Sequence, residues 1–432
     1  MSPADAGGQP RTTPRLHRLA NGVRVIADPM PGLESVGVSV VVHSGARWEK
    51  PEELGWSHLL EHMVFKGAGA RGAHDIVEAI EAKGGQINAA TGYERTSFQV
   101  RGMADVLTLG LEICADLIRR PTLAAEDLVR EKQVVGQEIA EAADTPDDRV
   151  FDLAQAAAFE RQPLGRPILG TTESVDAASP ARLRAFHHGY YAPERLCVAV
   201  AGRVDEDDLL QRVEALFGDM RPSRGDQPTP AAAVFSGGDR QEQRRLEQAQ
   251  LVLLLPGVGL HDRHYFTARL FAEVLGGGMA SRLFQEVREK RGLAYAIDSY
   301  AEAYEDVGLL GVYAGLAAED AGAAAALIAE EIVKLAERVS ETELARAKAQ
   351  LKAHLYMGLE SPLTRAEHAA GQAFLFNRLM PAQELAAAIE ATTPHDFRTY
   401  GEAALSRRRR ALATLGSKRA GEAAKAFDRA LA

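Results

Sequence analysis

The chain repeats its own pattern of apolar strands and helices, and this repetition constrains the fold more than any other feature. Each copy has an alternating or continuous apolar strand, then a helix, then two further apolar strands. The strands of the first copy are residues 36–42, 96–101 and 196–201, and its helix contains residues 58–62 and stops near residue 67. The corresponding segments of the second copy are the strands 251–255, 309–314 and 411–415 and the helix 266–275. A repeat of this length predicts a duplicated fold.

The boundary between the copies lies in residues 221–232, where Pro222, Pro228 and Pro230 indicate an exposed linker. We therefore predict two homologous halves, residues 1–220 and 233–432. The fold class is α+β, because strand and helix patterns occur in both halves without a regular alternation of parallel units. Each half is predicted to form a mostly antiparallel sheet of several strands with helices packed on one face.

The composition is that of a soluble globular protein, with 432 residues, 46% hydrophobic and 25% charged. No apolar run approaches the 18 residues that a membrane-spanning helix needs, so we expect no membrane partner. Residues 1–14 lack the apolar core of a secretory signal, which favours a cytoplasmic location and leaves a periplasmic one open. Cys114 and Cys197 stand alone in apolar surroundings and are expected to be buried thiols of a reducing compartment.

The acidic charge is concentrated in the first half. Residues 1–220 contain 23 Lys and Arg against 33 Asp and Glu, whereas residues 221–432 contain 27 of each. This distribution favours basic rather than anionic partners and argues against nucleic-acid binding. The glycine triplet at residues 276–278 is not followed by a phosphate-binding motif, and a flexible loop is the better interpretation.

The pentapeptide His58-Leu59-Leu60-Glu61-His62 has the spacing of a metal site on a helix. At about 100° per residue, its two imidazoles and its carboxylate project within an arc of roughly 100°. Two neutral imidazoles one turn apart suit Zn²⁺, and a carboxylate beside them can accept a proton from water. The alternative is an amphipathic helix whose histidines recur by chance, because short motifs produce false matches.

A catalytic zinc site needs a third protein ligand from elsewhere in the chain. Residues 121–143 are predicted to form a helix in which Leu128, Glu131, Val135 and Glu138 share one stripe. Carboxylates on a core-facing stripe are costly unless a cation compensates them. The second half does not repeat this chemistry, because its helix at 266–275 has no ligand spacing and His354, opposite Glu138, has no partner of this kind.

The motif H-x-x-E-H, with a glutamate 76 residues later and another seven residues before that one, resembles the pitrilysin/insulinase family of zinc peptidases. Within this inverzincin family the chain is most similar to the bacterial branch related to mitochondrial processing peptidase. The resemblance implies one Zn²⁺ per chain, held by His58, His62 and Glu138. It implies Glu61 as the general base and Glu131 as a carboxylate behind the ligands.

The same resemblance assigns a substrate strand to the segment after Gly84-Gly85. The family carries an edge strand at the positions of Asn88, Ala89, Ala90 and Thr91, to which a peptide backbone pairs as an added strand. From the residues alone, glycine pairs and Asn88 equally indicate a turn. Asp148 and Asp152 match an acidic pair that receives a substrate arginine in presequence-cleaving relatives, or they complement the dipole at the start of a helix.

Arg288 and Tyr295 match the pair by which the family's second half stabilises the developing oxyanion; the alternative is a salt bridge at a helix end and a packed tyrosine. The resemblance implies a zinc endopeptidase in which two halves enclose a chamber for peptides or extended, unfolded segments, with a preference for basic residues near the cut. We expect a dimer, either a homodimer or a heterodimer with a related subunit. The alternatives are a non-catalytic core subunit derived from the family, and a zinc hydrolase with a non-peptide substrate.

Overall fold

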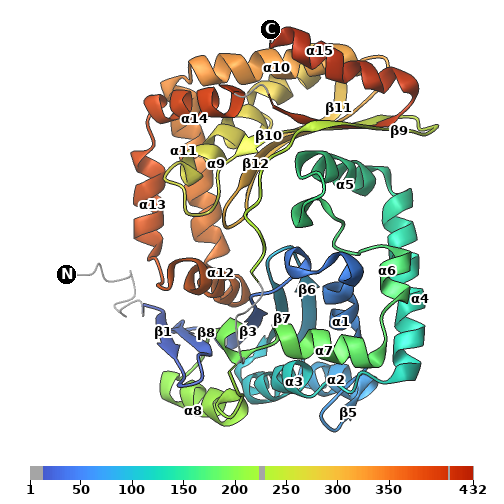
Figure 1. Cartoon of the computed structure of the whole chain (residues 1–432). Coiled ribbons are helices and arrows are strands. Elements are labelled where there is room, and N and C mark those ends of the chain that lie inside the picture. Colours follow the sequence, from blue (N-terminus) through green and yellow to red (C-terminus); the bar gives the residue numbers. More distant parts are fainter. Residues whose placement is uncertain (1–12, 223–228, 407–408, 432) are drawn as a thin grey trace. The chain divides into compact units, whose positions relative to one another are not determined.

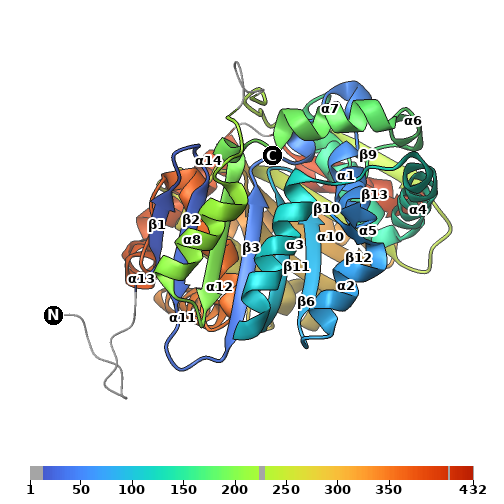
Figure 2. The ribbon, with the colours of Figure 1, turned by 90° about the horizontal axis from the view of Figure 1, so that it is seen from below.

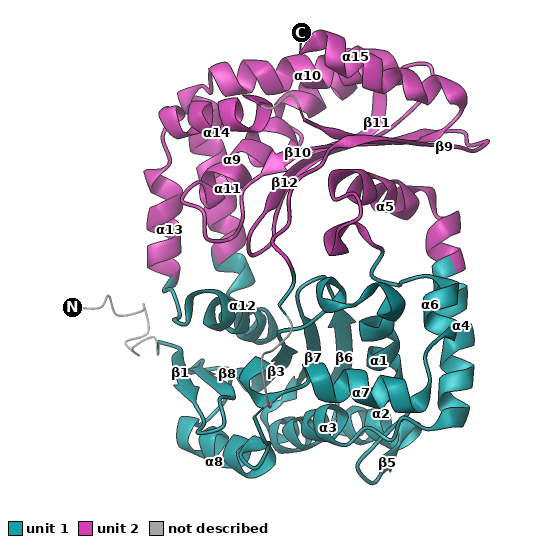
Figure 3. Cartoon of the chain, in the orientation of Figure 1, with its two compact units in different colours: residues 1–139, 167–230, 356–381 teal, residues 140–166, 231–355, 382–432 magenta. Residues whose placement is uncertain are grey.

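The computed structural model describes residues 13–222, 229–406 and 409–431 (Figure 1). The chain divides into two compact units, each with its own sheet and apolar core (Figure 3). Unit 1 comprises Met1–Ile139, Pro167–Pro230 and Tyr356–Pro381; unit 2 comprises Ala140–Arg166, Ala231–Leu355 and Ala382–Ala432. The predicted mixed architecture of helices and sheets in two related units is confirmed.

The sheet of unit 1 has the strand order β1-β2-β8-β3-β7-β6. β2 and β8 run parallel, and all other neighbours are antiparallel. The predicted strands all occur, with ends within two residues of those expected. The bounds are β1 Arg15–Arg18, β2 Arg24–Pro29, β3 Ser35–Val42, β6 Gln86–Thr91, β7 Thr96–Met103 and β8 Leu196–Gly202, with a separate hairpin of β4 Gly67–Ala68 and β5 Arg71–Gly72.

One face of this sheet is covered by several helices, as predicted. Helices α3 and α8 lie along it, against β3, β7 and β2 (Figure 2). Alternating valines of β3 pack into this core, because successive side chains of a strand point to opposite faces. The helices of unit 1 are α1 Trp56–Val64, α2 Ala73–Glu81, α3 Leu107–Arg119, most of α4 Ala125–Asp144, α6 Thr172–Asp176, α7 Pro180–Tyr190, α8 Glu206–Phe217 and α12 Pro362–Phe376.

The opposite face of the same sheet is closed by α12, a helix from the second half of the sequence. Its alanines pack against Ile26, Val41 and Cys197, and the small side chains allow a close approach. Gly37 of β3 permits the contact, since a Cβ atom there would lie 2.4 Å from the backbone nitrogen of Leu363. A sheet covered on both faces explains why β8 is apolar and buried along its whole length.

Unit 2 repeats this plan with the strand order β11-β12-β10-β13-β9, which matches β6-β7-β3-β8-β2 of unit 1. The one parallel pair, β9 with β13, corresponds to β2 with β8. The strands are β9 Gly238–Gln243, β10 Ala249–Gly257, β11 Ala294–Ala303, β12 Gly308–Leu316 and β13 Ala411–Gly416. The helices are α5 Pro146–Ala158, α9 Tyr265–Gly276, α10 Ala321–Glu337, most of α11 Glu341–Gly358, α13 Ala382–Ala391, α14 Pro394–Ser406 and α15 Glu422–Ala430.

The compact units depart from the predicted boundaries 1–220 and 233–432 at two segments. Residues 140–166, with α5, belong to unit 2, and residues 356–381, with α12, belong to unit 1. The physical reason is that both sheets have two apolar faces, so each needs a second cover; α5 packs on β13, β10 and β9 as α12 packs on β3, β8 and β2. Part of the predicted linker, residues 223–228, lies outside the described residues.

Local chemistry explains a smaller difference in α4. The helix begins at Ala125 rather than at Pro121, because Leu123 has a φ of 47°, which is incompatible with a right-handed helix. In the described part of the chain, no helix has the length and apolar character required to cross a bilayer.

Candidate metal centre

Helix α1 presents a core face and a polar face. Its core side chains, each at most 1% exposed, are Trp56, Leu59, Leu60, Met63 and Val64. The polar face carries His58, Glu61 and His62, all half-buried. The burial of the core face fixes the rotation of the helix, so the two imidazoles project together. Their ring centroids are 4.6 Å apart.

Helix α4 brings Glu138 to these two rings. Its Oε2 atom lies 3.7 Å from Nε2 of His58 and 3.5 Å from Nε2 of His62. Each residue offers a donor atom within 4.8 Å of the others, and these three form the only such group of His, Cys, Asp or Glu in the described ranges. Around a tetrahedral zinc ion with bonds of about 2.0–2.1 Å, donors lie roughly 3.4 Å apart. The spacing therefore fits a zinc ion.

Burial supports the same interpretation. Oε2 of Glu138 and Nδ1 of His58 are buried and accept or donate no hydrogen bond among the described residues. An unsatisfied buried carboxylate oxygen that faces two imidazole nitrogens is costly unless a cation joins them. Burial, together with the neighbouring His62, lowers the pKa of the His58 imidazole to about 4. The ring is consequently neutral at pH 7, the form that binds a metal ion.

Behind the triad, Glu131 is 4% exposed and joins two basic groups. Its Oε2 lies 3.1 Å from Nδ1 of His62, and its Oε1 accepts a hydrogen bond from Nζ of Lys66 at 2.9 Å. A carboxylate on Nδ1 favours the tautomer that leaves Nε2 free for a metal. Lys66 was not singled out from the sequence, because it lies in the turn that follows α1 and has no periodic signal.

Glu61 lies beside the triad and is held by strand β6. The Thr91 hydroxyl donates to Oε2 of Glu61 at 2.5 Å. Burial raises the pKa of the Glu61 carboxyl, although the Thr91 bond opposes the shift. The nearby Tyr191 is buried, and burial and the Glu61 charge both raise the pKa of its phenol. A carboxylate with a raised pKa is a better proton acceptor than an exposed one.

Strand β6 is an edge strand that, among the described residues, pairs only with β7. Asn88 and Ala90 are exposed, whereas Ala89 and Thr91 are half-buried and face the molecule. The strand lies beside α1. The prediction that residues 88–91 lie in an edge strand agrees with this structure, in which the strand begins at Gln86. Thr91 donates a hydrogen bond to Glu61, and its expected contact with substrate stays a prediction.

The remaining predicted site residues all belong to unit 2. Arg288 lies in a short π-helix, Phe284–Glu289, with its guanidinium 4.6 Å from the Phe284 ring and 5.7 Å from the Tyr295 ring. Tyr295 opens β11 and is 73% exposed. Tyr295 is open to solvent rather than packed in the core, and among the described residues Arg288 contacts the Phe284 and Tyr295 rings and forms no ion pair.

Asp148 and Asp152 lie one turn apart near the start of α5, also in unit 2. Asp148 is exposed and Asp152 is half-buried. Burial raises the pKa of Asp152, Arg149 opposes the shift and Asp148 reinforces it. The pair therefore prefers a nearby cation. The roles of these residues and of Arg288 and Tyr295 toward the metal site of unit 1 stay predictions.

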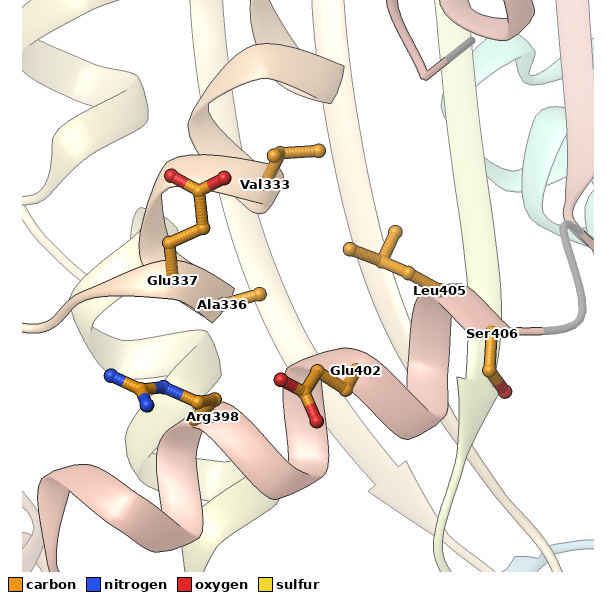
Figure 4. A pocket seen from close by; sticks show the side chains of 7 residues that line it. All are labelled: Val333, Ala336, Glu337, Arg398, Glu402, Leu405 and Ser406. Atoms are coloured by element: carbon orange, nitrogen blue, oxygen red, sulfur yellow. The ribbon is translucent and has the colours of Figure 1, made fainter.

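A cavity of about 630 Å³ occurs elsewhere, between α10 and α14 of unit 2 (Figure 4). Its walls combine apolar side chains with two carboxylates and a guanidinium, and the lining residues are Val333, Ala336, Glu337, Arg398, Glu402, Leu405 and Ser406. None of them belongs to the three-donor group described above. This cavity has no part in the metal centre.

Two family models match the chain. One, described as Insulinase (Peptidase family M16), matches residues 24–172, which include His58, His62 and Glu138. The other, described as Peptidase M16 inactive domain, matches residues 177–351. Fold and sequence together define a zinc protease-like protein of duplicated units. The chain belongs to the insulinase family, peptidase family M16, and the predicted family resemblance is confirmed.

Individual relatives agree with the family models. An uncharacterized zinc protease of Rickettsia felis is 35% identical over 371 residues, which cover 86% of this chain and 90% of the relative. A crystallised protease from Helicobacter pylori has a TM-score of 0.87 at 21% identity, covering 93% of this chain and 99% of that one. A chain of Complex III2 from Candida albicans has a TM-score of 0.84 at 20% identity, covering 96% and 99%. The two structures show a shared fold.

Proposed function

We propose that the protein is a zinc endopeptidase that cleaves peptides or extended, unfolded segments. The observation that carries this proposal is the meeting of His58, His62 and Glu138 from α1 and α4, with Glu61 beside them. These three residues would hold the ion. When bound, zinc supplies Lewis acidity toward water and toward the carbonyl group to be cleaved. The relative from Rickettsia felis is named an uncharacterized zinc protease, and this name supports the same cofactor.

The chain's own residues would perform the proton transfers and the positioning. Glu61 accepts a proton from the attacking water and delivers it to the leaving nitrogen, which its raised pKa favours. The free edge of β6 would pair with the substrate backbone through main-chain hydrogen bonds, with Asn88, Ala89 and Ala90 along the contact. Arg288 and Tyr295 would donate hydrogen bonds to the developing oxyanion.

Two finer features of the proposal concern the substrate. Asp148 and Asp152 would receive a basic side chain near the cut, and the burial of Asp152 supports this, because a cation relieves the cost of a desolvated carboxylate. The two units would enclose a chamber that excludes folded proteins. Cleavage profiling with a peptide library tests the first feature: a wild-type preference for arginine or lysine is expected, and the double variant D148N/D152N should lose it.

Zinc content and cleavage of a quenched fluorogenic peptide test the central proposal. The wild type should bind one zinc ion per chain, and Glu61→Gln should keep the zinc while cleavage falls on the order of 10²–10⁴-fold, the range of general acid–base catalysis. Glu141→Gln, on an exposed position of α4, is the control and should cleave like the wild type. Zinc-free wild type with no more cleavage than Glu61→Gln would refute the proposal.

A second candidate is a non-catalytic core subunit. It is favoured by the match of residues 177–351 to a model described as an inactive domain, and by the likeness to a chain of Complex III2. The retained ligands and base in residues 24–172 favour the peptidase instead. We further propose that the chain works in the cytoplasm as a homodimer or with a related subunit. Light scattering of the purified chain, alone and from its native source, distinguishes the assemblies.

A further inference from the structure

The amino end of α1 is held by a buried carboxylate that none of the proposed catalytic steps uses. Glu49 is 4% exposed and lies six residues before Gly55, the N-cap of the helix. Its Oε2 accepts a hydrogen bond from the Gly55 amide at 2.8 Å, and its Oε1 accepts one from the Ser57 amide at 2.7 Å. Amides in the first turn have no acceptor within a helix. Glu49 therefore supplies the cap that glycine cannot.

The other side of this helix end is equally constrained. Gly55 has a φ of 79°, and a Cβ atom there would lie 2.3 Å from the carbonyl oxygen of Leu169. The indole of Trp56 donates to the carbonyl oxygen of Ser174 at 2.8 Å, and the Ser174 hydroxyl donates to the Leu54 carbonyl at 2.7 Å. The first turn is thus clamped between Glu49 and the segment that contains Leu169 and Ser174. His58 follows the clamped Ser57 directly.

This cap is costly for stability. Burial raises the pKa of the Glu49 carboxyl to about 7, although the Ser57 and Gly55 amides oppose the shift, and the charge of Glu53 adds to it. The phenol of Tyr190, on α7, also faces this carboxylate. A serine or aspartate at the N-cap satisfies the same amides with its side chain open to water. A buried glutamate gives a rigid attachment to the protein core in exchange for that cost.

We propose that Glu49 is a positioning residue for the metal centre. By holding the Gly55 and Ser57 amides, it fixes the first turn of α1 and so the direction in which the His58 imidazole points toward Glu138. The inference rests on the proposed zinc site, and it adds a residue two contacts away from the ligand. Residues behind metal ligands change metal affinity by about 10- to 100-fold when they are altered, because small displacements of a ligand are felt at the ion.

Zinc affinity of the full chain, measured by competition with a coloured chelator, tests the inference. In Glu49→Gln one amide still finds an oxygen, whereas the other faces an NH₂ group that cannot accept its hydrogen bond. The variant should bind zinc about 10-fold more weakly. Glu52→Gln removes the same charge from an exposed neighbouring position and should bind zinc like the wild type.

The zinc-free melting temperature separates positioning from stability alone. A purely structural Glu49 would lower this temperature and leave zinc affinity intact; that result overturns the inference and leaves the proposed function standing. Wild type that binds no zinc defeats both. If Glu49→Gln fails to fold, Glu49→Asp replaces it. The aspartate side chain is one methylene group too short to reach both amides, so this variant is expected to bind zinc about threefold more weakly. Unchanged zinc affinity would overturn the inference.

Discussion

Helices α1 and α9 occupy equivalent places in the two units, yet only α1 carries a pair of histidines. Their buried positions coincide when Leu59, Leu60, Met63 and Val64 are aligned with Leu270, Phe271, Val274 and Leu275. This alignment puts Arg269 opposite His58, Ala272 opposite Glu61 and Glu273 opposite His62. The buried face is apolar in both helices, whereas the residues of the polar face differ between them.

The partner helices differ in the same way. On α11 of unit 2, Ala347 stands opposite Glu131 and His354 opposite Glu138. Burial raises the pKa of Glu273, and the charges of His354, Arg346 and Arg269 oppose the shift. Basic side chains thus compensate the acid of unit 2. In unit 1, by contrast, the buried oxygen of Glu138 faces two imidazoles without a hydrogen bond. The arrangement in unit 1, but not that in unit 2, therefore leaves a buried oxygen that a metal ion would compensate.

Removal of one histidine from each unit tests this comparison most strongly. His62→Ala deletes a ligand and should lower the zinc content from about one ion per chain to below about 0.1, since three protein ligands define such a site. His354→Ala should keep the full zinc content. Elemental analysis after dialysis against metal-free buffer measures both. Equal zinc loss in the two variants would show that the units share one ion or that neither site is as described.

The carboxylate behind the ligands should have the next largest effect. Glu131→Gln removes the charged partner of His62 Nδ1 and leaves the Lys66 ammonium without its carboxylate. Zinc affinity is expected to fall about 10- to 100-fold. Unit 2 has alanine at this place and, among its described residues, no comparable group of three donors. The result therefore measures how much zinc affinity the loss of this carboxylate alone costs. A fall of less than twofold in a chelator competition would contradict the role given to Glu131.

A smaller effect is expected at Thr91, which links the edge strand to the general base. Thr91→Val keeps the shape of the side chain and removes the hydroxyl that bonds Glu61, so kcat should fall about 10-fold with KM and zinc content unchanged. Thr91→Ser restores the hydroxyl and should recover most of the activity. If the valine variant raised KM instead, Thr91 would be a substrate contact, as the sequence resemblance implied.

The last prediction concerns pH and compares the amino ends of α1 and α9. α9 starts at an N-cap histidine, and the acid there, Asp262, is exposed. Glu49 has a folded-state pKa of about 7 against an ordinary value of 4.5, so the folded protein binds this proton more tightly than the unfolded chain does. The stability from that proton is complete below about pH 4.5 and is lost as the pH rises through 7, by up to about 3 kcal/mol.

Thermal unfolding of the zinc-free wild type and of Glu49→Gln, at pH 5 and pH 8, measures this effect. The difference in melting temperature, wild type minus variant, should fall at the higher pH. His58 titrates in the opposite sense, because its folded pKa is lowered, but it contributes equally to both proteins and cancels in the difference. A difference that does not change with pH would place the Glu49 carboxylate in water.

Helical periodicity puts His58 beside His62 and Glu131 on the same stripe as Glu138, but it does not bring the two helices together. The prediction of Glu138 as the third ligand came from the family resemblance. The central apolar strands were predictable from their apolar runs, whereas the polar strands β1 and β9 gave no such signal and were not predicted. Glu49 escaped prediction because its two hydrogen bonds depend on the path of a short loop with no periodic signal. The bond from Thr91 to Glu61 also escaped prediction, because a strand pattern gives the face of a side chain and not its neighbour.

The exchange of α5 and α12 could not be predicted for a related reason. An apolar strand shows that a sheet has two buried faces, but it does not show which distant helix covers the second one. Alanine-rich helices such as residues 146–158 and 362–376 have weak periodicity, and which sheet they pack against depends on the fit between their small side chains and the sheet surface. The same argument applies to the π-helix that contains Arg288, which local composition did not indicate.

The position of α12 has a consequence for how the protein is made. The first sheet is complete in sequence by residue 202, but the helix that covers its second face ends only at residue 376. During synthesis, more than a third of the polypeptide separates the end of β8 from the end of α12. Until α12 is made, the side chains of Ile26, Val41 and Cys197 have no cover and are exposed to solvent and to other chains. A chain that ended at residue 220 would lack α12 and would leave this face of the first sheet uncovered.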